Sequence, residues 1–163
     1  MNLIGQKAKK ASLKKINTKI KNKVLQRYAL LLNKEKNNIF KANQKDVLLA
    51  LKKGLKDNLI ERLIVDQNKL DNIIGSIKKI AKLKNPVDNT LEKWSRPNGL
   101  KINRVSIPIG VIGVIYESRP NVTSDVASLC FKAGNAVILK GGSEAINTNK
   151  ILAKLFRKSL KEN

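Results

Sequence analysis

The sequence contains no histidine and only one cysteine, Cys130, among its 163 residues. A lone thiol cannot form an intrachain disulfide, so nothing in the sequence indicates an oxidising compartment. With one cysteine and no histidine, the chain cannot supply a zinc-type site or a Ser-His or Cys-His nucleophile. These kinds of site are therefore excluded for this chain.

Long apolar runs are also missing. No stretch of ~18 apolar residues exists, and residues 1–32 alternate lysines with single aliphatic side chains, unlike the compact apolar stretch of a signal peptide. We therefore expect a soluble, cytoplasmic protein. The length and the hydrophobic fraction of 42% suit one globular domain.

Acidic and aromatic residues are scarce. The chain has 12 Asp and Glu against 34 Lys and Arg, a formal net charge of +22, and 4% aromatic residues. Such a charge is typical of proteins that bind nucleic acid or anionic membranes. The lysines continue to the end of the chain, few aromatic side chains are available to stack on bases, and abundant Lys, Asn and Ile together indicate an A/T-rich coding bias. We favour no nucleic-acid or membrane partner, and a basic surface that binds polyanions stays open as the alternative.

The first half of the chain has helical periodicity. Apolar residues at three- and four-residue steps between lysines predict an amphipathic helix over residues 3–33, and further helices follow. Gly54 is expected to end one of them. Asp57 and Asp66 are expected to be N-caps, and Pro86 stops the helix that Asp66 opens.

The period changes after this proline. Residues 91–95 and 100–107 read as two strands around residues 96–99, whose sequence Arg-Pro-Asn-Gly suits a reversing turn. Residues 109–116 are nearly all apolar and β-branched apart from two glycines. This composition predicts a strand buried on both faces, as in a parallel sheet.

The remaining sequence predicts a helix, a strand and a second helix. Apolar positions of residues 122–133 fall on one helical face, and residues 136–139 form a short, buried strand. Gly141 and Gly142 suit a tight turn, and Ser143 is expected to be the N-cap of the final helix. The resulting β-α-β-α order, entered from helices, predicts an α/β fold with helices on the faces of a parallel sheet.

Residues 140–144, Lys-Gly-Gly-Ser-Glu, lie where a predicted strand ends and a helix begins. Backbone N–H groups and the helix dipole can meet an anion there, and Lys140 adds a positive charge. Glycine lets a ligand approach the backbone. The segment is neither the G-x-G-x-x-G fingerprint nor a P-loop, and paired glycines often only turn the chain. A nucleotide site and a simple turn therefore both remain open.

Residues 117–121, Glu-Ser-Arg-Pro-Asn, follow the first parallel strand at the edge where open α/β sheets bind ligands. The planar fork of Arg119 can pair with phosphate or carboxylate, and the Asn121 amide can donate to a developing oxyanion. The alternative is that Asn121 or Thr123 caps the next helix and Arg119 is solvated. Cys130 lies mid-helix on an apolar face, so we expect a buried packing cysteine and not a nucleophile.

The order and spacing of these motifs resemble the γ-glutamyl phosphate reductases of the aldehyde dehydrogenase superfamily. YESRPN at residues 116–121 and GGSEA at residues 141–145 carry the resemblance most specifically. The stretches that resemble this family are Arg104 to Thr123, Gly134 to Ala145, Ala42-Asn43 with Asp46, Gly54-Leu55, Arg62-Leu63 and Trp94 to Leu100. The resemblance covers essentially the whole chain and corresponds to the amino-terminal part of the family's proteins.

The resemblance implies NADPH-dependent reduction of L-glutamate 5-phosphate to L-glutamate 5-semialdehyde in proline biosynthesis, by a homo-oligomer with an aldehyde dehydrogenase-like, Rossmann-like cofactor-binding domain. By position, Asn121 matches the asparagine that stabilises the oxyanion, and Lys140 matches the lysine that contacts the adenosine ribose and its 2′ substituent. Gly141, Gly142, Ser143 and Glu144 then belong to the cofactor site. Arg119 as a contact of the substrate phosphate is our hypothesis.

The family's nucleophilic cysteine lies in a later catalytic domain. We therefore expect residues 1–163 to form a partial cofactor-binding domain, with a helical segment (1–88) and a hairpin with a β-α-β-α segment (89–163). The catalytic domain is absent, so the chain alone is expected to be inactive. Two alternatives are a truncated module that binds nucleic acid or anionic surfaces through its basic helices, and a subunit that pairs with a separate catalytic half.

Overall fold

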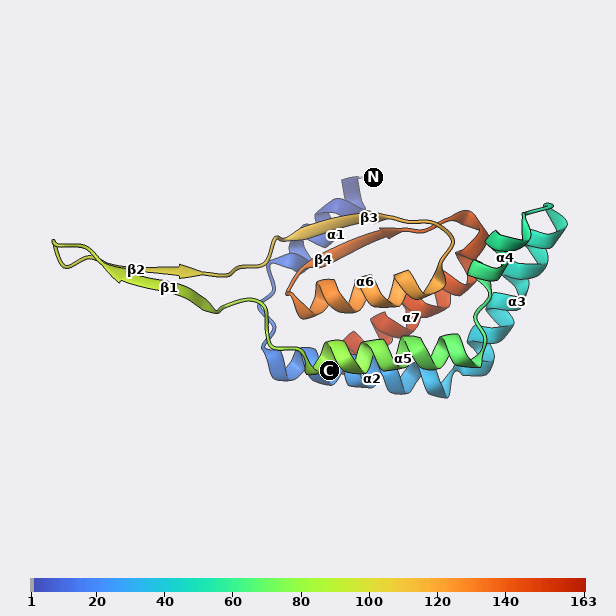
Figure 1. Ribbon diagram of the computed structural model, residues 1–163, viewed down its shortest axis with the longest axis horizontal. Coiled ribbons are helices and arrows are strands. Elements are labelled where there is room, and N and C mark those ends of the chain that lie inside the picture. Colours follow the sequence, from blue (N-terminus) through green and yellow to red (C-terminus); the bar gives the residue numbers. More distant parts are fainter. Residues whose placement is uncertain (1) are drawn as a thin grey trace.

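The computed structural model describes residues 2–163, which form a helical body with one projecting hairpin (Figure 1). The elements in chain order are α1 (Asn2–Ser12), α2 (Thr18–Lys34), α3 (Lys36–Lys52), α4 (Asp57–Leu63), α5 (Gln67–Lys82), β1 (Thr90–Ser95), β2 (Lys101–Val105), β3 (Val111–Ile115), α6 (Pro120–Lys132), β4 (Ala136–Lys140), the 3-10 helix η1 (Ser143–Ala145) and α7 (Ile146–Lys161). The predicted order of helices followed by β-α-β-α is confirmed.

Helix boundaries in the first half follow local capping chemistry. Asp66 is the N-cap of α5, where its side chain accepts from the Lys69 N–H at 2.7 Å. Gly54 ends α3 with a left-handed φ of 67°, and the following Leu55 N–H donates to the Ala50 carbonyl. The prediction for Asp57 is wrong by one position, because Lys56 is the N-cap of α4.

The predicted helix over residues 3–33 is in fact two helices. The chain leaves helical geometry between α1 and α2, and Asn17 caps α2 by accepting from the Ile20 N–H at 2.8 Å. The break turns α1 away from α2, so that α1 contacts β3 and β4. The Asn17 side chain favours this break. An asparagine that accepts from an otherwise unpaired backbone N–H stabilises the start of a new helix, and so competes with one continuous helix.

The strands form two separate pairs. β1 and β2 are antiparallel, with Ser95 opposite Lys101, and the hairpin that they form extends away from the body (Figure 1). β3 and β4 are parallel, with Ile115 opposite Lys140, and α6 connects them. In Figure 1 α6 and α7 lie between this parallel pair and the helices α2 and α5. The predicted α/β fold is confirmed.

The prediction that residues 109–116 are buried on both faces is wrong. Ile109 is 83% exposed and Ile115 is 82% exposed. Among the described residues the parallel sheet has two strands, so each strand has an unpaired outer edge. β4 is likewise half-buried along residues 136–139. Apolar composition reports how well a strand tolerates burial, whereas its actual burial depends on the elements that surround it.

The core joins the first and second halves of the chain. Tyr28 on α2 is fully buried; its ring packs edge-on against Phe156 with centroids 4.9 Å apart, and its hydroxyl lies 2.7 Å from the Ser124 hydroxyl. Side chains from α2, α5, α6 and α7 belong to the same buried cluster. This packing gives the amphipathic helices their apolar partner and holds α6 rigidly beneath the parallel strands.

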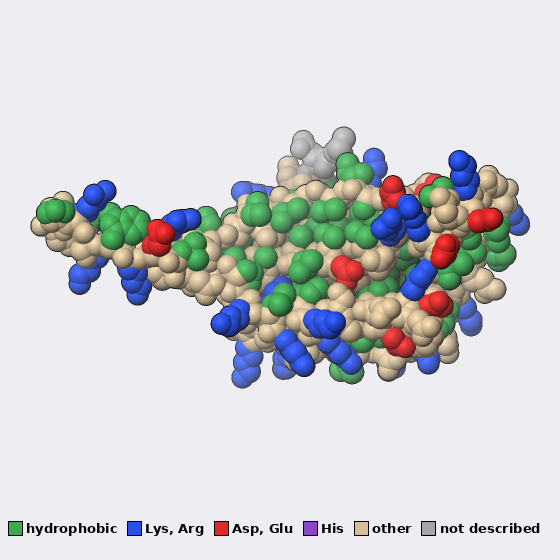
Figure 2. All heavy atoms as spheres, in the orientation of Figure 1, with side chains coloured by type: hydrophobic (Ala, Val, Ile, Leu, Met, Phe, Trp, Pro, Cys, Tyr) green, Lys and Arg blue, Asp and Glu red, His purple; other side chains and the backbone are tan. Residues whose placement is uncertain are grey.

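The surface carries its positive charge in a dispersed way. In the view of Figure 2, Lys and Arg side chains lie along the hairpin, the lower rim and the end beside α4. Across residues 2–163, the helices are too short or too polar for any of them to cross a membrane.

Candidate active site and cofactor turn

The two predicted ligand-binding segments lie side by side. Parallel strands end at the same edge of a sheet, so the loop after β3 meets the turn after β4 at the right-hand end of the body in Figure 1. The Ser118 hydroxyl donates to Glu144 Oε2 at 2.7 Å, and the Tyr116 N–H donates to the Lys140 carbonyl at 3.1 Å. Tertiary structure therefore joins two clusters that the sequence separates.

The glycine turn is packed tightly against the chain's own side chains. A Cβ on Gly141 would lie 2.5 Å from Asn149 Nδ2 and 2.8 Å from Tyr116 Cζ. A Cβ on Gly142 would overlap the Ser118 hydroxyl. Packing therefore disfavours a side chain at either position, whatever the turn binds.

A hydroxyl and amide network holds this turn in place. Thr123 donates its single hydroxyl hydrogen to Asn149 Oδ1 at 2.8 Å, so it accepts the hydrogen of the Tyr116 hydroxyl, 2.6 Å away. The chain of bonds links the loop after β3 to α6 and α7. Periodicity could not reveal this network, because its three members come from different elements.

Glu144 and Lys140 differ in how they are held. Glu144 accepts from the Ser118 hydroxyl and, at 2.8 Å, from the Ser143 hydroxyl. These hydrogen bonds, with that of Ser118 contributing most, lower the pKa of the Glu144 carboxyl. Lys140 is exposed at the end of β4, and within residues 2–163 its ammonium takes part in no ion pair. Its charge is available to an external anion.

Ser143 is not the N-cap of α7, contrary to the prediction. It begins the 3-10 helix η1 that precedes α7. The first N–H groups of α7 are instead satisfied by Asp46 of α3, which accepts from Asn147 N–H at 3.1 Å and Thr148 N–H at 2.8 Å. The Asp46 carboxylate thus occupies the N-terminus of α7. An external anion at the glycine turn would therefore contact Lys140 and the backbone that precedes α7.

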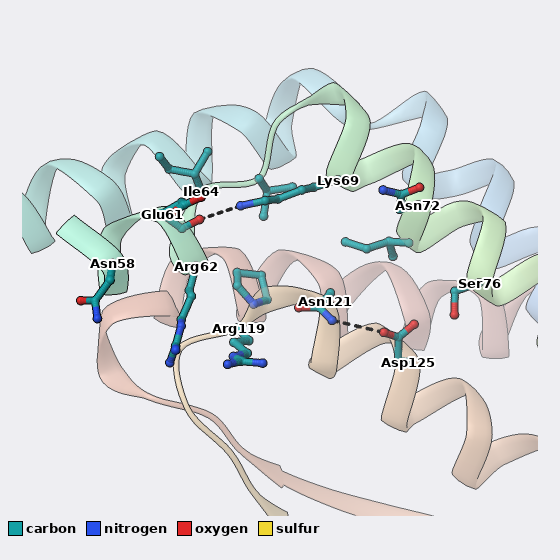
Figure 3. Close-up of a pocket in the computed structure, with 13 residues that line it drawn as sticks. Asn58, Glu61, Arg62, Ile64, Lys69, Asn72, Ser76, Arg119, Asn121 and Asp125 are labelled. Atoms are coloured by element: carbon teal, nitrogen blue, oxygen red, sulfur yellow. Dashed lines mark hydrogen bonds between the residues drawn. The ribbon is translucent and has the colours of Figure 1, made fainter. Parts of the chain in front are cut away.

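Arg119 and Asn121 line a groove of about 730 Å³ between α4, α5 and the start of α6 (Figure 3). The other polar residues that line it are Asn58, Glu61, Arg62, Lys69, Asn72, Ser76 and Asp125. Arg62 is the main residue that the sequence did not assign to the site. It lies in the last turn of α4, and only the packing of α4 beside the loop after β3 brings it here.

The Asn121 amide faces Asp125 one helical turn later. Its Nδ2 donates to Asp125 Oδ2 at 3.4 Å (Figure 3), and because a carboxylate only accepts, this contact fixes which end of the amide turns that way. Among the bonds of residues 2–163, the second hydrogen of the same nitrogen has no acceptor. Neither Asn121 nor Thr123 caps α6, whose N-cap is Arg119 without a side-chain capping bond. The alternative role as a cap is therefore wrong.

Cys130 is a buried thiol in α6, as predicted. It is 8% exposed, and burial raises its pKa. A high pKa disfavours the thiolate that nucleophilic attack requires. Within residues 2–163, His, Cys, Asp and Glu form no group of three or more that could hold a metal ion.

Comparison with known proteins identifies the relatives of this arrangement. No protein-family model matches the chain. A gamma-glutamyl phosphate reductase of Thermodesulfovibrio yellowstonii is 45% identical over 98% of this chain and 40% of its own length. The crystal structure of gamma-glutamyl phosphate reductase from Thermotoga maritima matches with a TM-score of 0.94 and 39% identity, over 97% of this chain and 39% of that one. The chain is a homologue of the gamma-glutamyl phosphate reductases.

The likeness extends to the wider fold of the aldehyde dehydrogenases. A NAD-dependent benzaldehyde dehydrogenase of Corynebacterium glutamicum has a TM-score of 0.69 at 19% identity, over 94% of this chain and 32% of that chain. Identity this low shows the fold alone. The chain spans about 40% of the length of the gamma-glutamyl phosphate reductases that it matches. The resemblance predicted from YESRPN and GGSEA is confirmed.

Proposed function

We propose that the protein to which these residues belong catalyses the NADPH-dependent reduction of L-glutamate 5-phosphate to L-glutamate 5-semialdehyde, with release of phosphate, in cytoplasmic proline biosynthesis. The observation that carries the proposal is 45% identity to a gamma-glutamyl phosphate reductase across 98% of the chain. The fold alone is too general, because one fold can serve many substrates. The site geometry adds independent support.

In this proposal Asn121 and Arg119 act on the substrate. The Nδ2–H of Asn121 that is left free by Asp125 donates to the acyl oxygen while negative charge develops on it. Arg119 lines the same groove and offers a planar fork of donors that fits a phosphate. Both residues follow β3, so the rigid parallel strands fix their position relative to each other.

The turn after β4 is proposed to bind NADPH, which supplies the hydride. Lys140 pairs with the ribose and its 2′-phosphate, and residues 141–144 lie along the cofactor. Both carboxylate oxygens of Glu144 already accept from serine hydroxyls, and Lys140 is the exposed cation at this turn. A lysine can contact either ribose, so the choice of NADPH over NADH rests on the family resemblance.

We propose that residues 1–163 are a part of the cofactor-binding domain, with residues 1–88 and 89–163 as its two segments, and that turnover requires a thiolate from outside them. Cys130 is buried, with a raised pKa, and belongs to the packed face of α6. The projecting hairpin supports a homo-oligomer, because Leu91 and Leu100 are each 57% exposed on it.

The deciding experiment isolates the native protein from its source cells with an antibody raised against this chain. Its intact mass is measured, and it is assayed for phosphate-dependent reduction of NADP⁺ with glutamate 5-semialdehyde, the reverse reaction. We expect turnover, a loss of about 10²-fold in kcat in the Asn121→Ala variant, and little change in Asn72→Ala, which alters another groove asparagine.

The recombinant 163-residue chain is the matched negative control and is expected to show no turnover. Native protein without any NADP-linked activity toward this substrate would overturn the proposed function. Turnover by the recombinant chain would overturn the assignment of the nucleophile to another part of the protein.

A further inference from the structure

Two arginines from different elements converge on one carboxylate oxygen at the edge of the groove. Arg62 Nη1 lies 3.3 Å from Glu117 Oε2, and Arg119 Nε lies 4.0 Å from the same atom. Figure 3 shows the guanidinium groups of Arg62 and Arg119 side by side, at the same end of the groove. Arg62 is held by α4, and Arg119 is held at the start of α6.

This carboxylate holds the two cations weakly. The three side chains are 45% (Arg62), 72% (Glu117) and 49% (Arg119) exposed, and exposed ion pairs contribute little to stability. The 4.0 Å separation from Arg119 is too long for a hydrogen bond. One carboxylate also leaves one of the two positive charges unbalanced. Most of the N–H donors of both guanidinium groups therefore remain open to a ligand.

The end of the groove that holds the two arginines favours an anion over a cation. With Glu117 counted beside Glu61 and Asp125, carboxylates and cations are equal in number around the groove, but Arg62 and Arg119 lie together at one end of it. Arg119 is the N-cap of α6, and no acidic side chain lies in the first turn of this helix. The N-terminal end of the helix dipole adds to the positive potential that the two arginines create.

We propose that Arg62 and Arg119 together form a receptor for one phosphate or carboxylate group, and that Glu117 is an internal competitor for it. An oxyanion with two or more oxygens can accept from both guanidinium forks, whereas Glu117 reaches both with a single oxygen. The site explains why a carboxylate lies between two arginines at the mouth of a groove. That the natural anion belongs to the substrate rests on the proposed function, but the binding itself does not.

The chain offers a matched control pair. Arg104 Nη1 lies 3.4 Å from Glu92 Oε2 on the projecting hairpin, and the two side chains are 62% and 58% exposed. This pair resembles Arg62 and Glu117 in chemistry, distance and exposure, but it lies outside the groove. Variants at the two pairs change the net charge identically. They therefore separate binding at this site from general attraction to a chain with a charge of +22.

The test is a titration of the 163-residue chain with inorganic phosphate at constant ionic strength, followed by NMR of the arginine Nε–Hε signals. We expect saturable shifts of the Arg62 and Arg119 signals. Arg62→Gln is expected to weaken phosphate binding about tenfold, since it removes charge-assisted hydrogen bonds. Glu117→Gln is expected to tighten binding about threefold, as the loss of a weak surface competitor implies. Arg104→Gln and Glu92→Gln are expected to leave it unchanged.

Equal effects of Arg62→Gln and Arg104→Gln, or unsaturable shifts of all arginine signals, would overturn the receptor. Weaker binding in Glu117→Gln would overturn the competitor role. Failure of the proposed function can be distinguished from failure of the receptor. In that case the native protein shows no NADP-linked turnover, while this chain still binds phosphate. All four substituted residues are exposed, and the amide spectrum of each variant checks its fold.

Discussion

Asp46 on α3 caps the first turn of α7 through Thr148, although the two residues are 102 positions apart in the chain. Asp46 Oδ2 accepts from the Thr148 N–H at 2.8 Å and from its hydroxyl at 2.7 Å, and both residues are almost fully buried. The bond fixes the start of α7, which follows the glycine turn and η1. The same contact therefore stabilises the fold and positions the turn proposed to bind the cofactor.

The first prediction concerns this cap. Asp46→Ala should lower the free energy of unfolding by about 3 kcal/mol, because a helix cap is lost and buried donors of Thr148 lose their acceptor. Urea denaturation monitored by circular dichroism measures the change. Asp57→Ala, which removes an exposed carboxylate at the first turn of α4, should change it by less than about 0.5 kcal/mol. Equal losses in both variants would contradict the role of Asp46.

The second prediction compares two glycines with opposite expected signs. Gly141→Ala should destabilise the chain by about 2 kcal/mol, because the added methyl group meets Tyr116 and Asn149. Gly75→Ala should stabilise it by roughly 0.5–1 kcal/mol, since Gly75 lies inside α5 with no atom within 4 Å of the new Cβ. Thermal and urea unfolding give both values. A neutral Gly141→Ala would mean that the Tyr116 ring moves aside at little cost.

The third prediction concerns the only thiol. Because burial raises the pKa of Cys130, the native chain should react with Ellman's reagent far more slowly at pH 8 than the chain unfolded in guanidinium. The native rate should increase with pH as the thiolate fraction rises. Absorbance of the released thiolate follows the reaction. A native rate equal to the unfolded rate would indicate an accessible cysteine and would reopen its role as a nucleophile.

The fourth prediction concerns the carboxyl of Glu144. Its hydrogen bonds lower the pKa, so they stabilise the fold above the unfolded-state pKa, near the ordinary value of 4.5, and this contribution is lost as the pH falls through the folded-state pKa. Ser118→Ala should raise the pKa toward the ordinary value, and Ser143→Ala should raise it less, because Ser118 contributes more. Carbon-13 NMR of the side-chain carboxyl measures both. The reverse order would contradict the geometry of the turn.

Local chemistry accounts for the parts of the fold that could be predicted. Gly54 and Asp66 act on atoms within a few positions of themselves, so their roles as a helix end and an N-cap could be read from the sequence. The break at Asn17 was readable in the same way, but the continuous apolar spacing through residues 3–33 suggested one helix. The burial of β3 was overpredicted, because an apolar strand has the same sequence pattern at the edge of a sheet as at its centre.

The sequence by itself determined the helices, the β-α-β order and the residues that carry the family resemblance, because periodicity, capping and chain order act over short distances. Only the tertiary structure decided which polar residues meet. It placed Asp46 at α7, Tyr116 against Gly141, and Arg62 beside Arg119. Electrostatic and packing energies depend on separation in space, and separation in space follows from how α3, α4 and α7 pack around the parallel strands.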